Sequence, residues 1–503
     1  MEVILLKKYL RIIIVLAVIM SIIGCAQNTD NNNMEQSNEE ELIYGITTDP
    51  DHLDPFLATS ADSRVVLFNI FEGLLKPSSD GTMVPAIAES YEVSDDLMKY
   101  TFSLQDDVKF HNGKTVTADD VKYSLDKAVE YQLTGMEEVE NISIIDESTI
   151  QINLNQPDSE FYYNMTTAII PENYEDSNSR PIGTGPFKFE SYSPQEELVL
   201  TKFVDYRNPE LPKVDKLTFK IVADLNTVLF DLQAGSVNAS TLDTTLASQL
   251  DSNDFNIYYT NTNAVQIFCL NNSVEPLNNV LVRQAISYVV DANEIIDIAH
   301  NGHAERAASP VIPALKDGYN VALNDTYKKD VEKAKQLLDE AGYPDGFTLS
   351  ITVPSSYKQH VDTAQVIVNQ LGEIGISATI EQVDWSTWLS EVYKGRNYQT
   401  TVVSVDGITL SPRSYLSRYT KGNSLNFINY SNDKYNELYQ QSLVEADSEK
   451  RTELYHEMQK IISEDAASVF ICDISAPKVF KKGIEGFVPY PLYILDASTI
   501  YFE

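Results

Sequence analysis

The sequence predicts an α/β protein in which strands and helices alternate. From Leu42 onward, short runs rich in β-branched and aromatic residues alternate with longer segments of helical periodicity. Turn-forming residues separate these runs, and no fixed repeat relates them. Hydrophobic residues form 43% and charged residues 22% of the 503 residues, which is ordinary for globular domains with large cores. This alternation predicts α/β lobes with parallel sheets.

The first half of the chain carries most of the strand patterns. Residues 42–47 form a short apolar run that the turn-rich segment 49–55 ends, and residues 63–75 have helical spacing. Thr117 precedes a helical pattern with acidic residues in its first turn, which predicts an N-cap. Further strand patterns lie at 99–110 (a strand pair), 142–156 (a hairpin), 187–192, 196–203 and 216–222.

Helical patterns dominate the second half. Residues 280–300 and 330–341 each place apolar side chains on one face of a helix. Gly342 is the expected C-cap of the second helix. A strand pattern at 347–353 precedes an amphipathic helix at 361–376. Strand and helix therefore follow one another as in βαβ units.

The charge balance excludes several classes of partner. The chain has 37 Lys and Arg residues against 74 Asp and Glu residues, a formal net charge of −37. Nucleic acid binds a basic face and anionic lipid repels an acidic protein, so neither is expected as a partner. Three cysteines are too few for a disulfide scaffold. Cys269 and Cys472 could pair in an oxidising compartment or stay as buried free thiols.

The first 24 residues are typical of an export signal. A basic segment precedes the apolar run 12–23, which is shorter than the roughly 20 residues of a spanning helix. Residues 22–25, Ile-Ile-Gly-Cys, resemble the lipobox of bacterial lipoproteins, which implies that Cys25 receives lipid and becomes the mature N-terminus. An uncleaved anchor or an incidental cysteine is the alternative. Residues 25–41 are polar and indicate a flexible tether.

No motif in the sequence supports an enzyme. The patterns GxxxxGK[ST], GxSxG, HExxH and CxxC are all missing. The segment Gly183-Thr184-Gly185 is followed by Pro186 and a strand pattern, so it does not open a phosphate-binding helix. His300 and His303 could hold a metal ion, although such a pair is more often a polar loop. We therefore expect no catalytic residue, no metal site and no cofactor.

Four blocks of the sequence resemble one family. Residues 83–129 resemble the hallmark block of the peptide/nickel class of ABC-transporter solute-binding proteins, and 183–192, 270–291 and 330–351 keep that family's order. Together with LDPF at 53–56 they cover most of residues 42–475. The resemblance implies a monomeric extracytoplasmic receptor, lipid-anchored through Cys25. It would capture a short peptide or similar small solute and deliver it to an ABC permease in the membrane.

The resemblance also implies a two-lobed clamshell of the class II periplasmic-binding-protein type with an inserted subdomain. Ligand would sit between the lobes, and closure would bury it. Two crossing strands, near 264–270 and 470–476, would form the hinge. The implied segments are 42–78, 180–265 and 475–503 for lobe I, 79–179 for the subdomain inserted in it, and 266–474 for lobe II.

The same resemblance places a ligand site in residues 382–416. Trp385 matches a tryptophan that lines the family's pocket, and Asp406 matches the aspartate that binds a peptide's α-ammonium. A carboxylate suits that role, because a buried ammonium needs a charged partner. Residues 402–405, with Val403 and Val405, could pair as an edge strand with an extended peptide. An ordinary loop aspartate is the alternative for Asp406.

Two departures and several secondary candidates complete the expected site. The family's tryptophan three residues before the aspartate is replaced by Val403, and the following proline comes two residues late, at Pro412. Both departures indicate a reshaped pocket, so a nickel-chelate, an opine, a glycan or a peptide signal is the alternative ligand. The remaining candidates are Tyr357 as a pocket tyrosine, Lys358, His360 or Arg413 as the cation for a peptide carboxylate, and Thr59 and Ser60 as residues that face the cleft.

The lipobox resemblance gives a first testable prediction. The Cys25→Ala variant cannot accept lipid, so it should move from the membrane fraction to the soluble fraction when cells are fractionated and the protein is detected by immunoblot. The control Cys269→Ala should stay with the membranes. A Cys25→Ala protein that remains membrane-bound after its signal has been cleaved would contradict the assignment.

Overall fold

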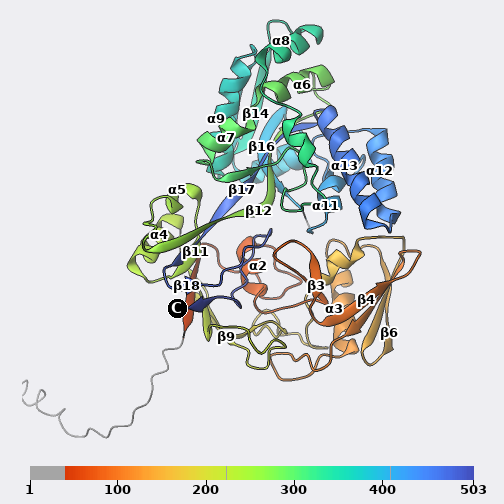
Figure 1. Ribbon diagram of the computed structural model, residues 1–503, viewed down its shortest axis with the longest axis vertical. Helices are drawn as coiled ribbons and strands as arrows, with labels where there is room; N and C mark the ends of the chain where they lie inside the picture. Colours follow the sequence, from red (N-terminus) through yellow and green to blue (C-terminus); the bar gives the residue numbers. More distant parts are fainter. Residues whose placement is uncertain (1–39, 223, 408) are drawn as a thin grey trace, which may run out of the picture. The chain divides into compact units, whose positions relative to one another are not determined.

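The computed structural model describes residues 40–222, 224–407 and 409–503, and residues 40–503 form one compact unit. The export signal, Cys25 and residues 26–39 of the tether lie outside the described residues. An eleven-stranded sheet runs through the unit in the order β15-β14-β16-β12-β17-β11-β1-β10-β9-β8, with β13 (Ala304–Arg306) beside β17 (Figure 1). Within the described part, no helix has the length and apolarity needed to cross a membrane.

The part of the protein drawn at the bottom of Figure 1, which we call the lower half, is built on five of these strands. They are β1 (Glu41–Ile46), β8 (Phe187–Ser193), β9 (Glu197–Lys202), β10 (Lys216–Ile221) and β11 (Ala239–Thr241). The strand β1 is parallel to β10 and to β11, whereas β8, β9 and β10 pair antiparallel. The helices α2 (Ala61–Leu67), α4 (Leu225–Ala234) and α5 (Thr244–Ala247) belong to this half.

A second, four-stranded sheet also belongs to the lower half. It has the order β4 (Ala88–Val93), β5 (Lys99–Leu104), β7 (Thr149–Leu154), β6 (Val139–Asp146) and is antiparallel throughout. Its helix α3 (Ala118–Glu130) begins at the expected cap, since the Thr117 and Asp120 side chains accept each other's backbone N–H. The short strands β2 (Leu75–Pro77) and β3 (Met83–Pro85) and the 3₁₀ helix η1 (Phe161–Thr166) join the two sheets.

The upper half is built around β14 (Thr348–Pro354), which is parallel to both β15 (Ser377–Val383) and β16 (Thr400–Asp406). One face of this sheet packs under α6 (Val280–Val289), α7 (Ala292–Ala299), α8 (Val331–Glu340) and α9 (Lys358–Gly372). The other face packs under α11 (Pro412–Leu416), α12 (Asp433–Val444) and α13 (Ser448–Glu464). Separate apolar cores thus lie on the two faces of the sheet.

Several expected elements differ in the structure. The main sheet is mixed and not parallel. Only α2 of the helix expected at 63–75 forms, because the Asn69 side-chain amide donates to the Val65 carbonyl and to Leu495, ending the helix. Of 99–110 only β5 is a strand. Residues 280–300 form two helices and not one. The Asp291 side chain accepts the Asn293 backbone N–H and so caps the start of the second helix.

Two long strands join the halves. The strand β12 (Phe255–Leu270) pairs antiparallel with β17 (Ser468–Lys481). Its first part, to Asn261, lies opposite the end of β17 in the lower half; its second part, from Val265, lies between β16 and β17 in the upper half. The register shifts between Asn261 and Val265, next to Asp473. The ladder is therefore interrupted where the chain passes from one half to the other, as the expected hinge requires.

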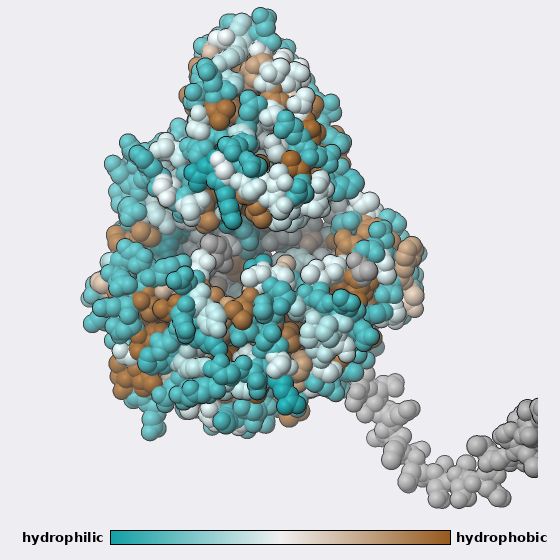
Figure 2. Space-filling view, turned by 180° about the vertical axis from the view of Figure 1, so that it is seen from behind, coloured by the Kyte–Doolittle hydropathy of each residue, from teal (hydrophilic) through white to brown (hydrophobic). Residues whose placement is uncertain are grey.

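A buried ion cluster forms a second contact between the halves. Glu160, in the lower half, accepts from Arg451 Nε at 3.2 Å and lies 3.6 Å from Arg413 Nε. Arg413 also donates to Asp158; burial alone would lower its pKa, but the charges of Glu160 and Asp158 outweigh burial and raise it. Next to this cluster, the Ser159 backbone N–H donates to the Leu443 carbonyl at 3.0 Å. The cluster lies at α11 and α13, which Figure 1 shows away from the crossing of β12 and β17; Figure 2 shows a recess between the halves.

Removing one charge from this cluster should destabilise the protein. Glu160→Gln leaves two buried guanidinium groups with one fewer carboxylate, and breaking a buried ion pair costs about 3 kcal/mol or more. Urea unfolding should show that loss. The matched control Glu437→Gln breaks an exposed pair with Lys434, at 3.7 Å, and should change the unfolding free energy by less than about 1 kcal/mol. Equal effects of the two substitutions would contradict the structural role of the cluster.

Candidate functional site

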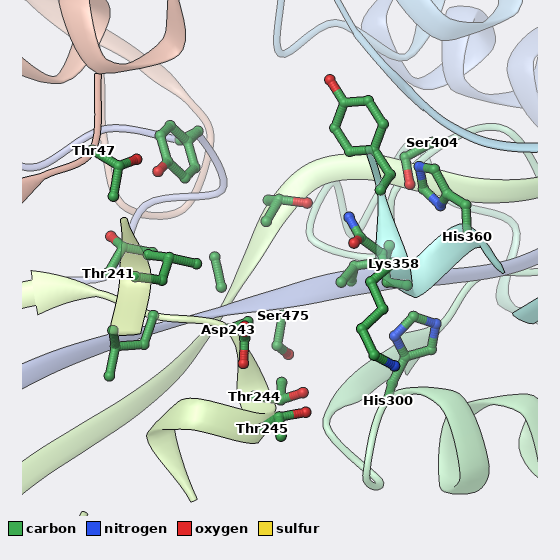
Figure 3. Close-up of a pocket in the computed structure, with 18 of the residues that line it drawn as sticks. Thr47, Thr241, Asp243, Thr244, Thr245, His300, Lys358, His360, Ser404 and Ser475 are labelled. Atoms are coloured by element: carbon green, nitrogen blue, oxygen red, sulfur yellow. The ribbon is translucent and has the colours of Figure 1, made fainter. Parts of the chain in front are cut away.

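A cavity of about 590 Å³ lies beside the joining strands, between the two halves. Figure 3 shows Thr47, Thr241 and Asp243–Thr245 of the lower half on one side, and Lys358, His360, His300 and Ser404 of the upper half on the other. Ser475 of β17 lies between the two groups. Cavities of 300–1,000 Å³ suit small-molecule ligands, so this one has the size of a solute site.

The upper wall of the cavity is aromatic. Trp385 stacks on Trp388 with ring centroids 5.0 Å apart, and Tyr357 meets Trp385 edge-on at 5.2 Å. Trp388 is buried and its Nε1 donates to Thr401. These contacts hold the Trp388 ring in place beneath Trp385. Trp385 and Tyr357 stay 37% and 38% exposed. Both expected aromatics therefore lie side by side in the cavity with free faces for a ligand.

Two buried histidines line the same wall. Gln266 of β12 lies 3.0 Å from His360 Nδ1 through its amide nitrogen and 3.0 Å from His300 Nε2 through its oxygen. Burial lowers the pKa of His300 to about 4 and that of His360 to about 3. Both imidazoles are therefore neutral at pH 7, so the expectation that His360 could be a cation for a carboxylate is corrected. His303, which the sequence suggested as a possible metal ligand together with His300, stacks on the Tyr259 ring.

Lys358 lines the cavity, but its charge already has a partner. It is the first residue of α9, and its ammonium pairs with the Asp362 carboxylate one turn later. Its side chain is 84% exposed, so solvent screens the pair. The ammonium has further N–H donors that remain available to a ligand in the cavity.

The lower half contains a buried aspartate and a buried lysine near the cavity that the sequence patterns did not indicate. Asp62, on α2, is 9% exposed in the cavity wall and accepts the Thr48 backbone N–H at 3.0 Å. Lys478 of β17 lies behind it, 3.3 Å from the Tyr44 hydroxyl and 4.8 Å from the Tyr493 ring centroid. Burial raises the pKa of Asp62 and lowers that of Lys478 to about 8. The sequence feature that could have indicated this buried group is a lysine within the apolar run of β17.

The strand β16 presents an unpaired edge to the cavity. On one side, residues 400–406 pair with β12, but β14 pairs only with Thr400 and Thr401 on the other. The remaining edge, from Val402 onward, has no strand partner among the described residues. Val403 and Ser404 line the cavity there, and the buried Ser404 hydroxyl has no hydrogen-bond partner in the described chain. Val405 packs against the same apolar core as Val403, on the strand face opposite to Ser404.

The other expected site residues lie outside this cavity wall. Asp406 ends β16 two residues beyond Ser404, on the same strand face; its side chain is 58% exposed and lies 3.5 Å from Arg418. Arg413 belongs to the buried ion cluster, paired with Asp158 and Glu160. Thr59 donates to Asp51, and Ser60 caps α2. The structure therefore engages Arg413, Thr59 and Ser60 in contacts within the protein.

The described residues offer no metal or redox site. No group of three or more His, Cys, Asp or Glu side chains in them is placed to hold a metal ion. Cys269 and Cys472 are both buried free thiols, and burial raises the pKa of each. Their side chains belong to different apolar cores, on opposite faces of the sheet.

Sequence comparison relates the chain to known binding proteins. Residues 82–427 match the family described as bacterial extracellular solute-binding proteins, family 5, middle region. The dipeptide-binding protein DppE of Bacillus subtilis is 24% identical, over 97% of this chain and 98% of the relative. The glutathione-binding protein GsiB of Pectobacterium atrosepticum is 27% identical, over 92% of this chain and 93% of the relative.

Solved structures share the fold. The ABC transporter substrate-binding protein CtaP of Listeria monocytogenes superposes with a TM-score of 0.84 at 26% identity, covering 92% of this chain and 99% of that one. DppA of Helicobacter pylori, solved with the peptide STSA, gives 0.75 at 25% identity with the same coverages. These similarities confirm the predicted two-lobed α/β clamshell.

The interruption between Asn261 and Val265 surrounds a buried carboxyl group. Asp473 is fully buried; one oxygen accepts the Thr262 backbone N–H at 3.0 Å and the other has no partner in the described residues. Glu305 of β13 is its neighbour across the ladder. Burial raises the pKa of Asp473 to about 7, against an ordinary value near 4.

This carboxyl group predicts a pH-dependent stability. Asp473 binds a proton more tightly in the folded chain than in the unfolded chain, so protonation stabilises the fold. This stabilisation is full below about pH 4 and is lost as the pH rises through about 7. Asp473→Asn should therefore gain a few kcal/mol over the wild type at pH 8 and little at pH 4, since each pKa unit is about 1.4 kcal/mol. Urea unfolding at several pH values measures this difference. A pH-independent difference, like that expected of the exposed control Asp297→Asn, would exclude the effect.

Proposed function

The chain belongs to the bacterial extracellular solute-binding proteins of family 5, and we propose that it captures short peptides between its two halves and delivers them to an ABC permease in the membrane. Membership makes it a solute-binding protein and not an enzyme. The names of DppE and GsiB and the peptide bound to DppA support a peptide as the ligand class.

The unpaired edge of β16 carries this proposal. An extended peptide can add to such an edge through main-chain hydrogen bonds, with alternate side chains pointing to opposite sides. Val403 and Ser404 lie where the edge meets the cavity, and the unpartnered Ser404 hydroxyl would gain a partner from the ligand. The exposed faces of Trp385 and Tyr357 would pack on its side chains.

The lobes of this receptor would follow the two halves. We assign 42–78, 180–265 and 475–503 to lobe I, 79–179 to its inserted subdomain and 266–474 to lobe II. The register shift between Asn261 and Val265 supports a hinge there. Ligand would shift the population toward a closed form because it contacts both lobes at once.

The lipid anchor and the charged contacts complete the proposal. Cys25 would hold the protein at the outer face of the membrane, and the chain between it and β1, which begins at Glu41, would give it reach. Asp406 would bind the peptide's α-ammonium once closure has reduced its 58% exposure, since it follows Ser404 on the same strand face. Lys358 would be the cation for the peptide's carboxylate, with the N–H donors that its contact with Asp362 leaves free.

Mass spectrometry of small molecules released from the purified, denatured protein tests the ligand class directly. Peptides of a few residues are the expected result. Nickel-chelates, opines or glycans in their place would contradict peptide capture.

A double-mutant cycle tests the ammonium contact. Removing one partner of a charge pair buried by closure costs about 2–5 kcal/mol, so Asp406→Asn should weaken a bound peptide by about 30-fold or more. N-acetylation of the peptide should cost a similar factor, and the two losses should not add, because both remove the same contact. Calorimetric titration measures all four combinations. The exposed control Asp339→Asn should bind normally, and additive losses would remove Asp406 from the site.

A further inference from the structure

A network of uncharged polar side chains lies at the upper wall of the cavity. Gln266 of β12 is fully buried, and its cross-strand partner on β16 is Ser404. Residues directly opposite each other in a ladder point to the same face of a sheet. Phe268 and Val402, the next such pair on that face, pack into the core under α7 and α9. The Gln266 and Ser404 side chains therefore lie on the sheet face that these helices cover.

The contacts of Gln266 fix the orientation of its amide group. Its amide nitrogen lies 3.4 Å from the Gln359 carbonyl oxygen, which can only accept a hydrogen bond, and 3.0 Å from His360 Nδ1. Its oxygen accepts from the Thr363 hydroxyl at 3.0 Å and lies 3.0 Å from His300 Nε2. The amide nitrogen therefore donates to His360, and the amide oxygen accepts from His300.

These two contacts determine where each imidazole carries its proton. His360 accepts at Nδ1, so the neutral ring has its proton on Nε2. His300 donates from Nε2, so its Nδ1 keeps a lone pair. Neither His360 Nε2 nor His300 Nδ1 makes a hydrogen bond to another described residue. One ring thus has a donor to offer and the other an acceptor.

Both rings line the cavity, at the same wall as Ser404 (Figure 3). They are neighbours, because the two ends of one amide group hold them and a charge on His300 would lower the pKa of His360. The Ser404 hydroxyl, which has no partner in the described chain, can both donate and accept. We call His300, His360 and Ser404 the neutral cluster, since it offers hydrogen bonds but no charge at pH 7.

The neutral cluster lies between the two charged contacts proposed for the ends of a peptide. On β16, Ser404 comes two residues before Asp406, on the same strand face. On the other side, the charge of Asp362 acts on His300, and Asp362 pairs with Lys358. Alternate side chains of a peptide added to the edge of β16 would point to the sheet face that carries the cluster. A short peptide held at both ends would therefore bring a side chain to it.

The cluster suits a side chain that is polar and uncharged. An apolar side chain would cover the His360 N–H and the His300 lone pair without replacing their hydrogen bonds to water, which costs about 1–3 kcal/mol for each buried group. A carboxylate would face the His300 lone pair and the nearby Asp362. A carboxamide has an oxygen that can accept from His360 and an NH₂ group that can donate to His300 or to Ser404.

We propose that the neutral cluster is a side-chain subsite that selects a carboxamide, the side chain of Gln or Asn, in the captured peptide. The proposal rests on peptide capture and adds a preference among peptides. Gln266 is the positioning residue of the subsite, because its amide group sets which nitrogen of each ring faces the solute with a proton and which with a lone pair.

The test compares tripeptides in which Gln, Met or Glu replaces one alanine of Ala-Ala-Ala, at each position in turn. Met has nearly the length of Gln without its hydrogen bonds, and Glu has its shape with a charge. Calorimetric titration of the wild type measures each affinity. At one position, the Gln peptide should bind about 10- to 100-fold more tightly than its Met and Glu counterparts, since it replaces one or two buried hydrogen bonds.

Two variants remove the groups that face the solute and keep the contacts with Gln266. The amide of Asn extends as far as His Nδ1, so His360→Asn can still accept from Gln266 but has no donor at the position of Nε2. The amide of Gln extends as far as His Nε2, so His300→Gln can still donate to Gln266 but has no acceptor at the position of Nδ1. Each variant should lower the preference for Gln over Met by about 10-fold.

The ratio of the two affinities separates selection from a structural role. A merely structural role would weaken the Gln and Met peptides together and leave their ratio unchanged. The control His303→Asn removes an imidazole that does not line the cavity, and it should keep the preference of the wild type.

The remaining outcomes contradict the subsite in different ways. Equal binding of the Gln, Met and Glu peptides at every position, or a preference that persists in both His360→Asn and His300→Gln, would overturn the subsite and leave peptide capture intact. Tightest binding of a Glu peptide would overturn it as well, and would place a side-chain carboxylate at Lys358. If none of the tripeptides binds the wild type, peptide capture itself is contradicted and the subsite with it.

Discussion

The pairing of β12 with β17 is the constraint on which the rest of the structure depends. Residues 255–270 and 468–481 share one ladder, yet the first part of β12 belongs to the lower half and its second part to the upper half. Each half has its own apolar core, so each can keep its internal packing. The ladder connects the two halves. Their relative orientation can change with the smallest loss of hydrogen bonds at the register shift between Asn261 and Val265.

The opposite side of the boundary follows a different physical rule. There the contact is a set of buried charges, Glu160 and Asp158 against Arg413 and Arg451. Buried ion pairs contribute little net stability because desolvation offsets attraction, but they tolerate few alternative geometries. The boundary between the halves thus contains the β12–β17 ladder on one side and a geometrically specific ion cluster on the other.

Burial, more than formal charge, determines which side chains around the cleft carry a charge. His300 and His360 contribute hydrogen bonds through Gln266 but no charge at pH 7. Asp62 and Lys478 oppose each other behind the lower wall, which limits the field that either exerts on a ligand. If the chain captures peptides as proposed, attraction for a charged solute would come from exposed groups such as Asp406, whose exposure closure would change.

The sequence by itself determined the α/β class, the cap at Thr117, the Gly342 turn and the order of the family's blocks, because these depend on residues close together in the chain. It also placed Trp385 and Tyr357 in the cavity wall, through a resemblance that preserves local segments. Only the tertiary structure decided which charges are available to a ligand. Arg413 is neutralised by Asp158 and Glu160, more than 250 residues earlier, and His360 is neutral through burial beside Gln266. A side chain's charge and pairing are set by neighbours that folding brings from distant parts of the chain, and no local pattern records them.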